Sequence, residues 1–305
     1  MKNYDIVIIG AGPAGLSASI YGARAGKSVL LLEAGTYGGQ IINTPEVENY
    51  PGIKKISGFE FAMNLYEQAL NLGAEIEFEK AISIEDAGEA KAVVTEQNKY
   101  PCKAVIIATG AKNRPLGVEG EDKLVGSGIS YCATCDGAFF RGKDVAVVGG
   151  GNTALEDAMF LSEYCSKVYI IHRRDEFRGE EYLHGKLMER GNIEFVLDSV
   201  VDSIAGDGSV KGLMIKNRKT EEITEIQVSG VFVAIGQMPD NKDFEQIVKL
   251  DAKGYVEATE SCKTKTAGVF TAGDCRTKTV RQLATAAADG AVSALAAVEY
   301  INLMG

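Results

Sequence analysis

A mostly β-branched run that leads into a glycine-rich turn occurs twice in this chain. Residues 4–9 lead into G-A-G-P-A-G at 10–15, and residues 145–148 lead into G-G-G-N-T-A at 149–154. In a strand–turn–helix unit of this kind, the glycines permit the tight turn, the approach of a pyrophosphate to the backbone and close helix packing. The sequence therefore predicts two dinucleotide-binding units whose first glycines lie 139 residues apart.

Each copy also contains the later strands of such a unit. A second apolar strand is expected at 29–32 in the first copy and at 168–171 in the second. An apolar segment that ends in glycine closes each copy, at 104–110 and at 230–236. Strands that alternate with helical stretches are typical of parallel sheets covered by helices. We therefore predict an α/β protein with two Rossmann-like domains.

The tail after the second copy indicates how the two domains are connected. It contains an apolar segment at 268–275 and an alanine-rich helix at about 282–303, and it is too short for a third domain. Because the second copy is already complete, we expect the tail strand to join the first sheet. The second domain, 113–241, is then inserted into a discontinuous first domain, 1–112 and 242–305.

The residues at the end of the second strand distinguish the ligands of the two copies. Glu33 lies 23 residues after the first glycine, where a carboxylate accepts hydrogen bonds from ribose hydroxyls. The equivalent position in the second copy is His172, which opens a basic run with Arg173, Arg174 and Arg178. Guanidinium groups bind a 2′-phosphate bidentately, so the second copy is predicted to bind NADPH, unless the run is a solvated strand end. The first copy is predicted to bind FAD, the acceptor of these electrons.

Charge and hydropathy exclude two classes of partner. The chain has 32 Lys and Arg against 42 Asp and Glu, and a net charge of −10 opposes non-specific nucleic-acid binding. The long uncharged stretch at 6–23 contains four glycines and a proline, so it is interpreted as strand, turn and helix rather than a membrane span. No secretory signal is recognised, and we expect a cytoplasmic, reducing location.

Two of the six cysteines, Cys132 and Cys135, form a C-x-x-C motif. Such a motif can be half a zinc site, a redox pair or a coincidence. No second C-x-x-C and only two histidines are present, so no metal site is predicted and a reversible dithiol is favoured. Asp136 is predicted to act as a general acid, with a turn or helix-cap role as the alternative. The remaining cysteines are expected to pack as small hydrophobic residues; they lie at 102, 165, 262 and 275.

At these motifs the chain resembles the bacterial-type, low-molecular-weight NADPH-dependent thioredoxin reductases. The resemblance covers essentially the whole chain and implies a homodimeric flavoenzyme. Its discontinuous domain would bind FAD, and its inserted domain would bind NADPH and carry the cysteine pair. The matching motifs occur in family order: GAGPAG at 10–15, EAGTYGGQ at 33–40, ENYPG at 48–52, ATG at 108–110, CATCDG at 132–137, GGGNTA at 149–154, HRRDEFR at 172–178, AGD at 272–274 and RQL at 281–283.

The resemblance also implies the residues of each site. In the family, the cysteine at position 135 faces the flavin and the cysteine at position 132 attacks the disulfide of thioredoxin. The predicted FAD site consists of Gly10, Gly12, Pro13, Ala14, Gly15, Glu33, Ala34, Gly39, Gln40, Asn49, Thr109, Gly110, Gly273, Asp274, Arg281, Gln282 and Leu283. The predicted NADPH site consists of Gly149, Gly151, Asn152, Thr153, His172, Arg173, Arg174, Arg178, Ile235 and Gly236.

The implied activity is thioredoxin-disulfide reduction, in which electrons pass from NADPH to FAD, then to the cysteine pair and then to thioredoxin. Two alternatives within the enzymes remain. A ferredoxin-dependent flavin thioredoxin reductase would keep the cysteine pair and lose the arginine run. A reductase of another thioredoxin-like partner or of a peroxiredoxin is the second alternative, and the peroxiredoxin type would add a further C-x-x-C at its N-terminus.

Overall fold

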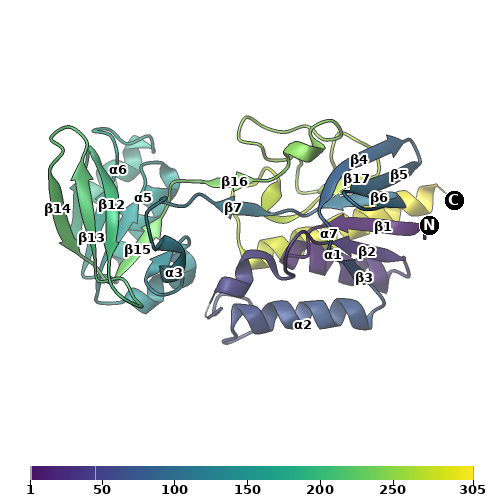
Figure 1. Ribbon diagram of the computed structural model, residues 1–305, viewed down its shortest axis with the longest axis horizontal. Helices are drawn as coiled ribbons and strands as arrows, with labels where there is room; N and C mark the ends of the chain where they lie inside the picture. Colours follow the sequence, from purple (N-terminus) through teal and green to yellow (C-terminus); the bar gives the residue numbers. More distant parts are fainter. Residues whose placement is uncertain (1, 45, 305) are drawn as a thin grey trace. The chain divides into compact units, whose positions relative to one another are not determined.

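The structure is a computed structural model that describes residues 2–44 and 46–304, so Met1, Pro45 and Gly305 of the predicted first domain lie outside the described residues. The chain divides into two compact units (Figure 1). The first unit consists of Met1–Lys112 and Met238–Gly305, and the second consists of Asn113–Gln237. The two connections each contribute a short strand, β7 (Ala111–Asn113) and β16 (Gln237–Pro239), and these strands pair with each other.

The chain returns to the first unit earlier than predicted, because residues 238–241 belong to that unit. The buried side chain of Asn241 provides the reason. It accepts a hydrogen bond from Thr109 Oγ1 at 2.8 Å and donates to the carbonyls of Gly254 and Cys275 at 2.9 Å each. All three partners lie in the first unit, and sequence spacing alone does not reveal these contacts.

The first unit is built on a seven-stranded sheet in the order β3-β2-β1-β6-β5-β4, with β17 paired to β6. The pairs around β1 and the pair of β17 with β6 are parallel, whereas β4, β5 and β6 pair antiparallel. The tail strand therefore joins the first sheet, as predicted. The strands are β1 (Tyr4–Ile9), β2 (Val29–Leu32), β3 (Glu75–Glu77), β4 (Ala81–Ala87), β5 (Ala90–Thr95), β6 (Lys99–Ile107) and β17 (Val269–Thr271).

Strand β1 is buried on both faces, which explains why its apolar residues do not alternate with polar ones. Ile6 and Ile8 pack into one core cluster with residues of α1 (Pro13–Arg24), α2 (Gly58–Asn71) and α7 (Leu283–Leu303). Val7 and Ile9 pack into a second cluster with β4, β5 and the segment around Val248. The long helix α7 lies beside α1 and the sheet in Figure 1.

The second unit contains a five-stranded parallel sheet in the order β11-β10-β9-β15-β8 and a separate antiparallel sheet, β12-β13-β14. Its strands are β8 (Ile129–Ser130), β9 (Asp144–Val148), β10 (Lys167–Ile171), β11 (Ile193–Val196), β12 (Ser199–Ala205), β13 (Gly212–Asn217), β14 (Ile223–Gln227) and β15 (Gly230–Val233). Its helices are α3 (Glu121–Leu124), α4 (Ala133–Asp136), α5 (Asn152–Ser162) and α6 (Glu181–Met188). Short 3₁₀ segments lie at η1 (Gly39–Asn43), η2 (Gly137–Phe140), η3 (Lys242–Phe244) and η4 (Gly273–Cys275) across the two units.

The predicted duplication is confirmed: each unit has a strand, a glycine turn and a helix in the predicted places. The two closing strands end before their predicted glycines, β6 at Ile107 and β15 at Val233. Gly110 and Gly236 have φ values of +69° and +104°, a conformation that ends a strand and favours glycine. Among residues 2–44 and 46–304, no helix is long and apolar enough to cross a membrane.

Candidate active site and cofactor sites

The first glycine turn leads from β1 directly into α1, which begins at Pro13. Gly10 has a φ of +105°, and a Cβ added there would lie 2.4 Å from the carbonyl oxygen of Ala108. A Cβ on Gly15 would lie 1.8 Å from the carbonyl oxygen of Gly10, so the first turn of α1 packs directly on the loop. No larger side chain fits at either position, and the turn brings the backbone and the positive end of α1 to one place.

The end of β2 is fastened to this turn by the predicted ribose contact. Glu33 accepts a hydrogen bond from the backbone amide of Ala11 at 2.8 Å and one from Gly35 at 2.9 Å. A carboxylate has about four acceptor positions, so this group can still accept bonds from ribose hydroxyls. Gly39 lies against the same turn, because a Cβ added to it would be 3.3 Å from Gly12 Cα. The structure thus brings together three segments of the predicted FAD site.

The start of α7 brings together further residues of that site. Gln282 caps this helix, and its Oε1 lies 3.4 Å from Asn49 Nδ2. The guanidinium group of Arg281 donates to the backbone carbonyl of Asp274 at 3.3 Å and stacks over the ring of Tyr255 at 4.2 Å. Gln40 donates to the backbone carbonyl of Ala111.

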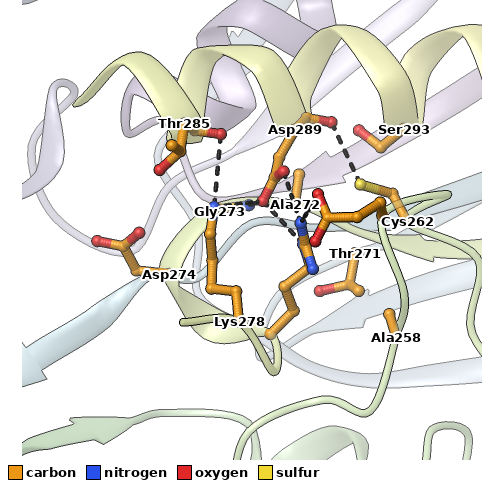
Figure 2. Close-up of polar contacts among 12 residues, drawn as sticks. Ala258, Cys262, Thr271, Ala272, Gly273, Asp274, Lys278, Thr285, Asp289 and Ser293 are labelled. Atoms are coloured by element: carbon orange, nitrogen blue, oxygen red, sulfur yellow. Dashed lines mark hydrogen bonds and ion pairs between the residues drawn. The ribbon is translucent and has the colours of Figure 1, made fainter. Parts of the chain in front are cut away.

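A buried ion cluster supports the loop that carries Asp274 (Figure 2). Asp289, on α7, accepts hydrogen bonds from the backbone amide of Gly273 at 3.0 Å and from Lys278 Nζ at 2.9 Å. It also accepts two bonds of 2.8 Å from Arg276, whose side chain is only 1% exposed. Gly273 has a φ of +79°, and Asp289 therefore holds the residue before Asp274 in a conformation that favours glycine.

The Asp274 carboxyl provides a test of whether a cofactor fits here. Its Oδ1 is buried and has no hydrogen-bond partner among the described residues. Burial raises the pKa of this carboxyl, which Lys278 and Arg281 oppose. Buried polar atoms are almost always hydrogen-bonded in native proteins, so an unpartnered oxygen beside a glycine turn fits a site for a polar ligand.

The second glycine turn repeats the geometry of the first between β9 and α5. Gly149 has a φ of +157°, and a Cβ added there would lie 2.4 Å from the carbonyl oxygen of Ala234 and 2.8 Å from Ala154 Cβ. Gly151 caps α5. The side chain of Asn152 is held at the start of α6, because it accepts a bond from the Glu180 amide at 2.8 Å and donates to the Glu180 carboxylate at 3.1 Å.

The basic run lies directly against this turn. The amide of Arg178 donates to the carbonyl of Gly150 at 2.7 Å, and the side chains of Arg173, Arg174 and Arg178 are all exposed. His172 differs from the arginines because its ring is buried: a Cβ added to Gly150 would lie 2.1 Å from the ring. Burial lowers the pKa of His172. The arginine side chains are thus accessible to a ligand, whereas the buried histidine ring packs against the backbone of the turn at Gly150.

The cysteine pair lies where β8 turns into the short helix α4. Cys132 and Cys135 form a disulfide with a Cα–Cα distance of 5.3 Å, and both residues are partly exposed. The amides of Cys135 and Asp136 donate to the carbonyl of Cys132 at 3.2 and 3.1 Å, so one helical turn closes the motif. A partly exposed disulfide in a rigid turn is accessible to a second thiol.

The other four cysteines are free and buried. Burial raises the pKa of Cys102 and Cys262 to about 12 each and that of Cys165 to about 11, and it also raises the pKa of Cys275. A thiol reacts as its thiolate, so these residues are unreactive near neutral pH, as predicted.

Comparison with known proteins identifies the family. The sequence profile described as "Pyridine nucleotide-disulphide oxidoreductase" matches residues 4–291. The chain belongs to this family. Thioredoxin reductase from Bacillus subtilis is 41% identical over 302 residues, covering 99% of this chain and 96% of that protein. Thioredoxin reductase from Peptoclostridium acidaminophilum is 43% identical over 310 residues, covering 99% and 98%.

A solved structure shows the same similarity in three dimensions. The crystal structure of thioredoxin reductase from Streptococcus pyogenes matches with a TM-score of 0.93 and 42% identity, covering 98% of each chain. The resemblance predicted from the motifs is therefore confirmed: within the pyridine nucleotide-disulphide oxidoreductases, this chain is one of the thioredoxin reductases.

In this pyridine nucleotide-disulphide oxidoreductase, Asp136 directly follows the second cysteine of the pair. Its two carboxyl oxygens differ in their hydrogen bonding. Its Oδ2 accepts a hydrogen bond of 2.6 Å from Ser130 Oγ. Its Oδ1 is buried without a hydrogen-bond partner among the described residues. Burial raises the pKa of the carboxyl, and the bond from Ser130 opposes that increase. A carboxyl of this kind retains its proton at a higher pH than an exposed one, as a general acid requires.

The structure adds residues that the sequence did not indicate. Ser130 contacts Asp136, Asn241 holds Thr109, and Asp289 holds the Gly273 loop. Ser130 lies only two positions before Cys132, so its proximity to the motif was the one available signal. Asn241 and Asp289 reach their partners across 132 and 16 positions, and no pattern in the sequence marks them.

Proposed function

We propose that this chain reduces the disulfide of thioredoxin, with electrons that pass from NADPH through FAD to the Cys132–Cys135 pair. The observation that carries the proposal is the partly exposed disulfide next to the partly buried carboxyl of Asp136, whose Oδ1 is buried. Two dinucleotide-binding turns in the same chain support it, because they allow one nucleotide to supply electrons and the other to receive them. The full-length thioredoxin reductase relatives support the choice of thioredoxin.

The first unit would hold FAD, and the residues present fit this group. The turn at Gly10 would receive the pyrophosphate, and Glu33 would accept bonds from the ribose hydroxyls. Asp274 Oδ1 would gain the partner that it lacks. FAD, when bound, supplies a two-electron carrier between NADPH and the disulfide. Asp289 and Arg281 would keep the loop around Asp274 in place.

The second unit would hold NADPH. The pyrophosphate would lie at the turn around Gly151, at the N-terminus of α5. The exposed guanidinium groups of Arg173, Arg174 and Arg178 would bind the 2′-phosphate, which distinguishes NADPH from NADH. Because this arginine run is intact, the ferredoxin-dependent alternative is not favoured.

Reduction of the cysteine pair consumes protons as well as electrons. Reduction of the Cys132–Cys135 disulfide takes two electrons and two protons, breaks one S–S bond and leaves two thiols. The partly buried carboxyl of Asp136 would supply one proton and become a carboxylate, and the other proton would come from solvent. The carboxylate would then regain its proton from solvent before the next cycle.

Transfer to thioredoxin is a thiol–disulfide exchange. The Cys132 thiol would lose its proton to solvent, and the resulting thiolate would attack one sulfur of the thioredoxin disulfide, which forms a mixed disulfide and releases the other sulfur as a thiolate that takes up a proton. Cys135 would then lose its proton and attack the sulfur of Cys132, and the second thioredoxin sulfur would leave as a thiolate and take up a proton. This step releases dithiol thioredoxin and forms the Cys132–Cys135 bond again. The family pattern assigns the order of the two cysteines, and their partial exposure is compatible with it.

A direct assay tests the proposed function. The purified FAD-loaded protein is mixed with NADPH, thioredoxin and a thiol-reactive dye. We expect the dye to be reduced only when the protein, NADPH and thioredoxin are all present. Cys132→Ser should abolish reduction of thioredoxin and leave reduction of the flavin by NADPH intact. Cys165→Ala, at a buried free cysteine of the same unit, is the matched control and should retain turnover. No thioredoxin-dependent turnover with NADPH, together with turnover when reduced ferredoxin is the electron donor, would overturn the proposal.

The homodimer and the cytoplasmic location implied by the resemblance stay predictions. Sedimentation of the purified protein tests the dimer, since a monomer at micromolar concentration would contradict it. Cell fractionation tests the location. Neither outcome affects the assignment of the cysteine pair.

A further inference from the structure

Ser130 is the residue that connects the proton donor to the backbone of the cysteine motif. Its Oγ lies 2.6 Å from Asp136 Oδ2, 3.0 Å from the amide nitrogen of Cys132 and 3.2 Å from the Cys132 carbonyl oxygen. Ser130 is only 4% exposed. It is the last residue of β8, where it pairs with Phe232 in the parallel sheet, so its backbone position is set by the core of the unit.

The hydrogen-bonding capacity of a hydroxyl decides how these contacts are used. A serine has one proton to donate and two lone pairs that accept. The amide of Cys132 can only donate, so Ser130 Oγ accepts from it. The single hydroxyl proton then goes to the nearer acceptor, Asp136 Oδ2, rather than to the more distant Cys132 carbonyl. Ser130 thus fixes Asp136 relative to the first cysteine of the motif.

This arrangement makes the two oxygens of Asp136 unequal. Oδ2 already accepts a proton in a short hydrogen bond, whereas Oδ1 is buried and has no partner among the described residues. In the neutral carboxylic acid, the proton is therefore held on Oδ1. After that proton leaves, the hydroxyl still donates to Oδ2, and the buried carboxylate keeps one charge-assisted hydrogen bond.

We propose that Ser130 is a positioning residue for the acid step, because it orients the Asp136 carboxyl, leaves the transferable proton on Oδ1 and stabilises the carboxylate that forms. The inference deepens the proposed function and rests on it for the identity of the proton acceptor, a thiolate of the reduced cysteine pair. In the step, the O–H bond of Oδ1 breaks and an S–H bond forms, so that one thiolate becomes a thiol and the carboxyl becomes a carboxylate.

Tyr164, Arg141 and Asp157 are further ionisable side chains of the second unit, and they act on one another rather than on the pKa of Asp136. The hydroxyl of Tyr164 is buried against Gly137, where a Cβ would lie 2.2 Å away from it. The guanidinium group of Arg141 lies over the Tyr164 ring at 5.4 Å. Asp157, on α5, has a pKa raised to about 7 by burial. Burial and Ser130 are the causes that move the pKa of Asp136, so a loss of the Ser130 hydroxyl leaves burial unopposed.

The experiment is an infrared titration of the Asp136 carboxyl in the oxidised, FAD-loaded protein. The C=O band of the protonated acid is assigned by its loss in Asp136→Asn, and its amplitude is followed against pH. In Ser130→Ala the carboxylate loses its hydrogen bond, so we expect the titration midpoint to move to higher pH by about one to two units. Ser130→Thr keeps a hydroxyl and should retain a midpoint close to that of the unchanged protein.

A matched control separates positioning from a general loss of structure. Ser162 is also buried, at 7% exposure, and its Oγ donates only within α5, to the Met159 carbonyl at 2.7 Å. Ser162→Ala should leave the midpoint unchanged. An unchanged midpoint in Ser130→Ala, or an equal shift in Ser162→Ala, would overturn the proposal. If Ser130→Ala does not fold, Ser130→Gly replaces it with the same expectation, and a displaced midpoint in Ser130→Thr also counts against the proposal.

A second measurement links the midpoint to the chemistry. The rate of single-turnover reduction of the disulfide by NADPH is recorded against pH. In Ser130→Ala, the alkaline limb of this profile, where the rate falls, should move to higher pH together with the carboxyl midpoint. A limb that stays in place while the midpoint moves would show that Asp136 is not the donor and would overturn the inference. The titration itself uses neither NADPH nor thioredoxin, so a failure of the proposed function is distinguishable from a failure of this one.

Discussion

Asp289 and Arg276 form a bidentate ion pair inside the first unit, with both nitrogen–oxygen distances at 2.8 Å. The side chains are 7% and 1% exposed. Lys278 adds a second cation at 2.9 Å, and the amide of Gly273 adds a fourth donor. One carboxylate on α7 therefore pairs with two buried cations and fixes the loop that precedes Asp274, while the exposed Glu260 provides Arg276 with a second, longer ion pair at 3.3 Å.

Removal of this carboxylate should destabilise the first unit strongly. Asp289→Ala removes the carboxylate that pairs with Lys278 and leaves Arg276 with only its longer contact to the exposed Glu260. Breaking a buried pair in this way costs about 3–5 kcal/mol. Urea denaturation at saturating FAD, followed by circular dichroism, measures the change. Glu299→Ala on the same helix is the control, because its pair with Lys263 is exposed and should matter by less than about 1 kcal/mol. Similar shifts in the two variants would contradict the assignment.

Two helical glycines should respond to alanine in opposite directions. Gly290 lies where α7 meets α1, and a Cβ added there would be 2.2 Å from the Ala14 carbonyl oxygen. Gly290→Ala should therefore destabilise the protein by about 1–3 kcal/mol through overpacking. Gly185, in α6, has no atom within 4 Å of an added Cβ, so Gly185→Ala should stabilise by about 0.5–1 kcal/mol. Thermal denaturation of both variants tests the contrast, and a stabilising Gly290→Ala would refute the close packing.

The raised pKa of Asp157 predicts a pH-dependent loss of stability. Burial raises this pKa from 3.8 to about 7, so the ionised form is disfavoured in the folded state. Below about pH 4 the group is protonated in both states and causes no loss; stability falls as the pH rises towards about 7. Asp157→Asn should match the unchanged protein at pH 4 and exceed its denaturation midpoint at pH 8. Asp207→Asn, at an exposed loop position, is the control and should show no such difference.

The arginine run should determine the preference for NADPH. Each of Arg173→Ala, Arg174→Ala and Arg178→Ala removes a charge-assisted contact to the 2′-phosphate, which should lower kcat/KM for NADPH by roughly tenfold to a hundredfold. The value for NADH, which lacks this phosphate, should change little. Arg190→Ala is a control from the same unit, since Arg190 pairs with Glu163 at 2.6 Å. Parallel losses with both nucleotides would argue against 2′-phosphate recognition.

Much of this molecule follows from local sequence patterns. The strands β1 and β9, the glycine turns after them and the helices α1 and α5 lie where the motifs predict, because Gly10, Gly15 and Gly149 are required by the backbone itself. The cysteine pair was recognisable because it also depends only on residues close together in the sequence: two thiols three positions apart meet within one helical turn. Even the joining of β17 to the first sheet followed from counting complete units.

Only the tertiary structure decided which side chains support these motifs. Ser130 reaches Asp136 because β8 ends beside α4, Asn241 draws the chain back to the first unit before the predicted boundary, and Asp289 meets Arg276 inside the core. The physical reason is that a turn or a strand depends on neighbours in sequence, whereas burial and hydrogen-bond geometry depend on segments that folding brings together. The sequence alone determined the two nucleotide turns and the dithiol, and the packing around them decided how the proton donor and the FAD loop are held.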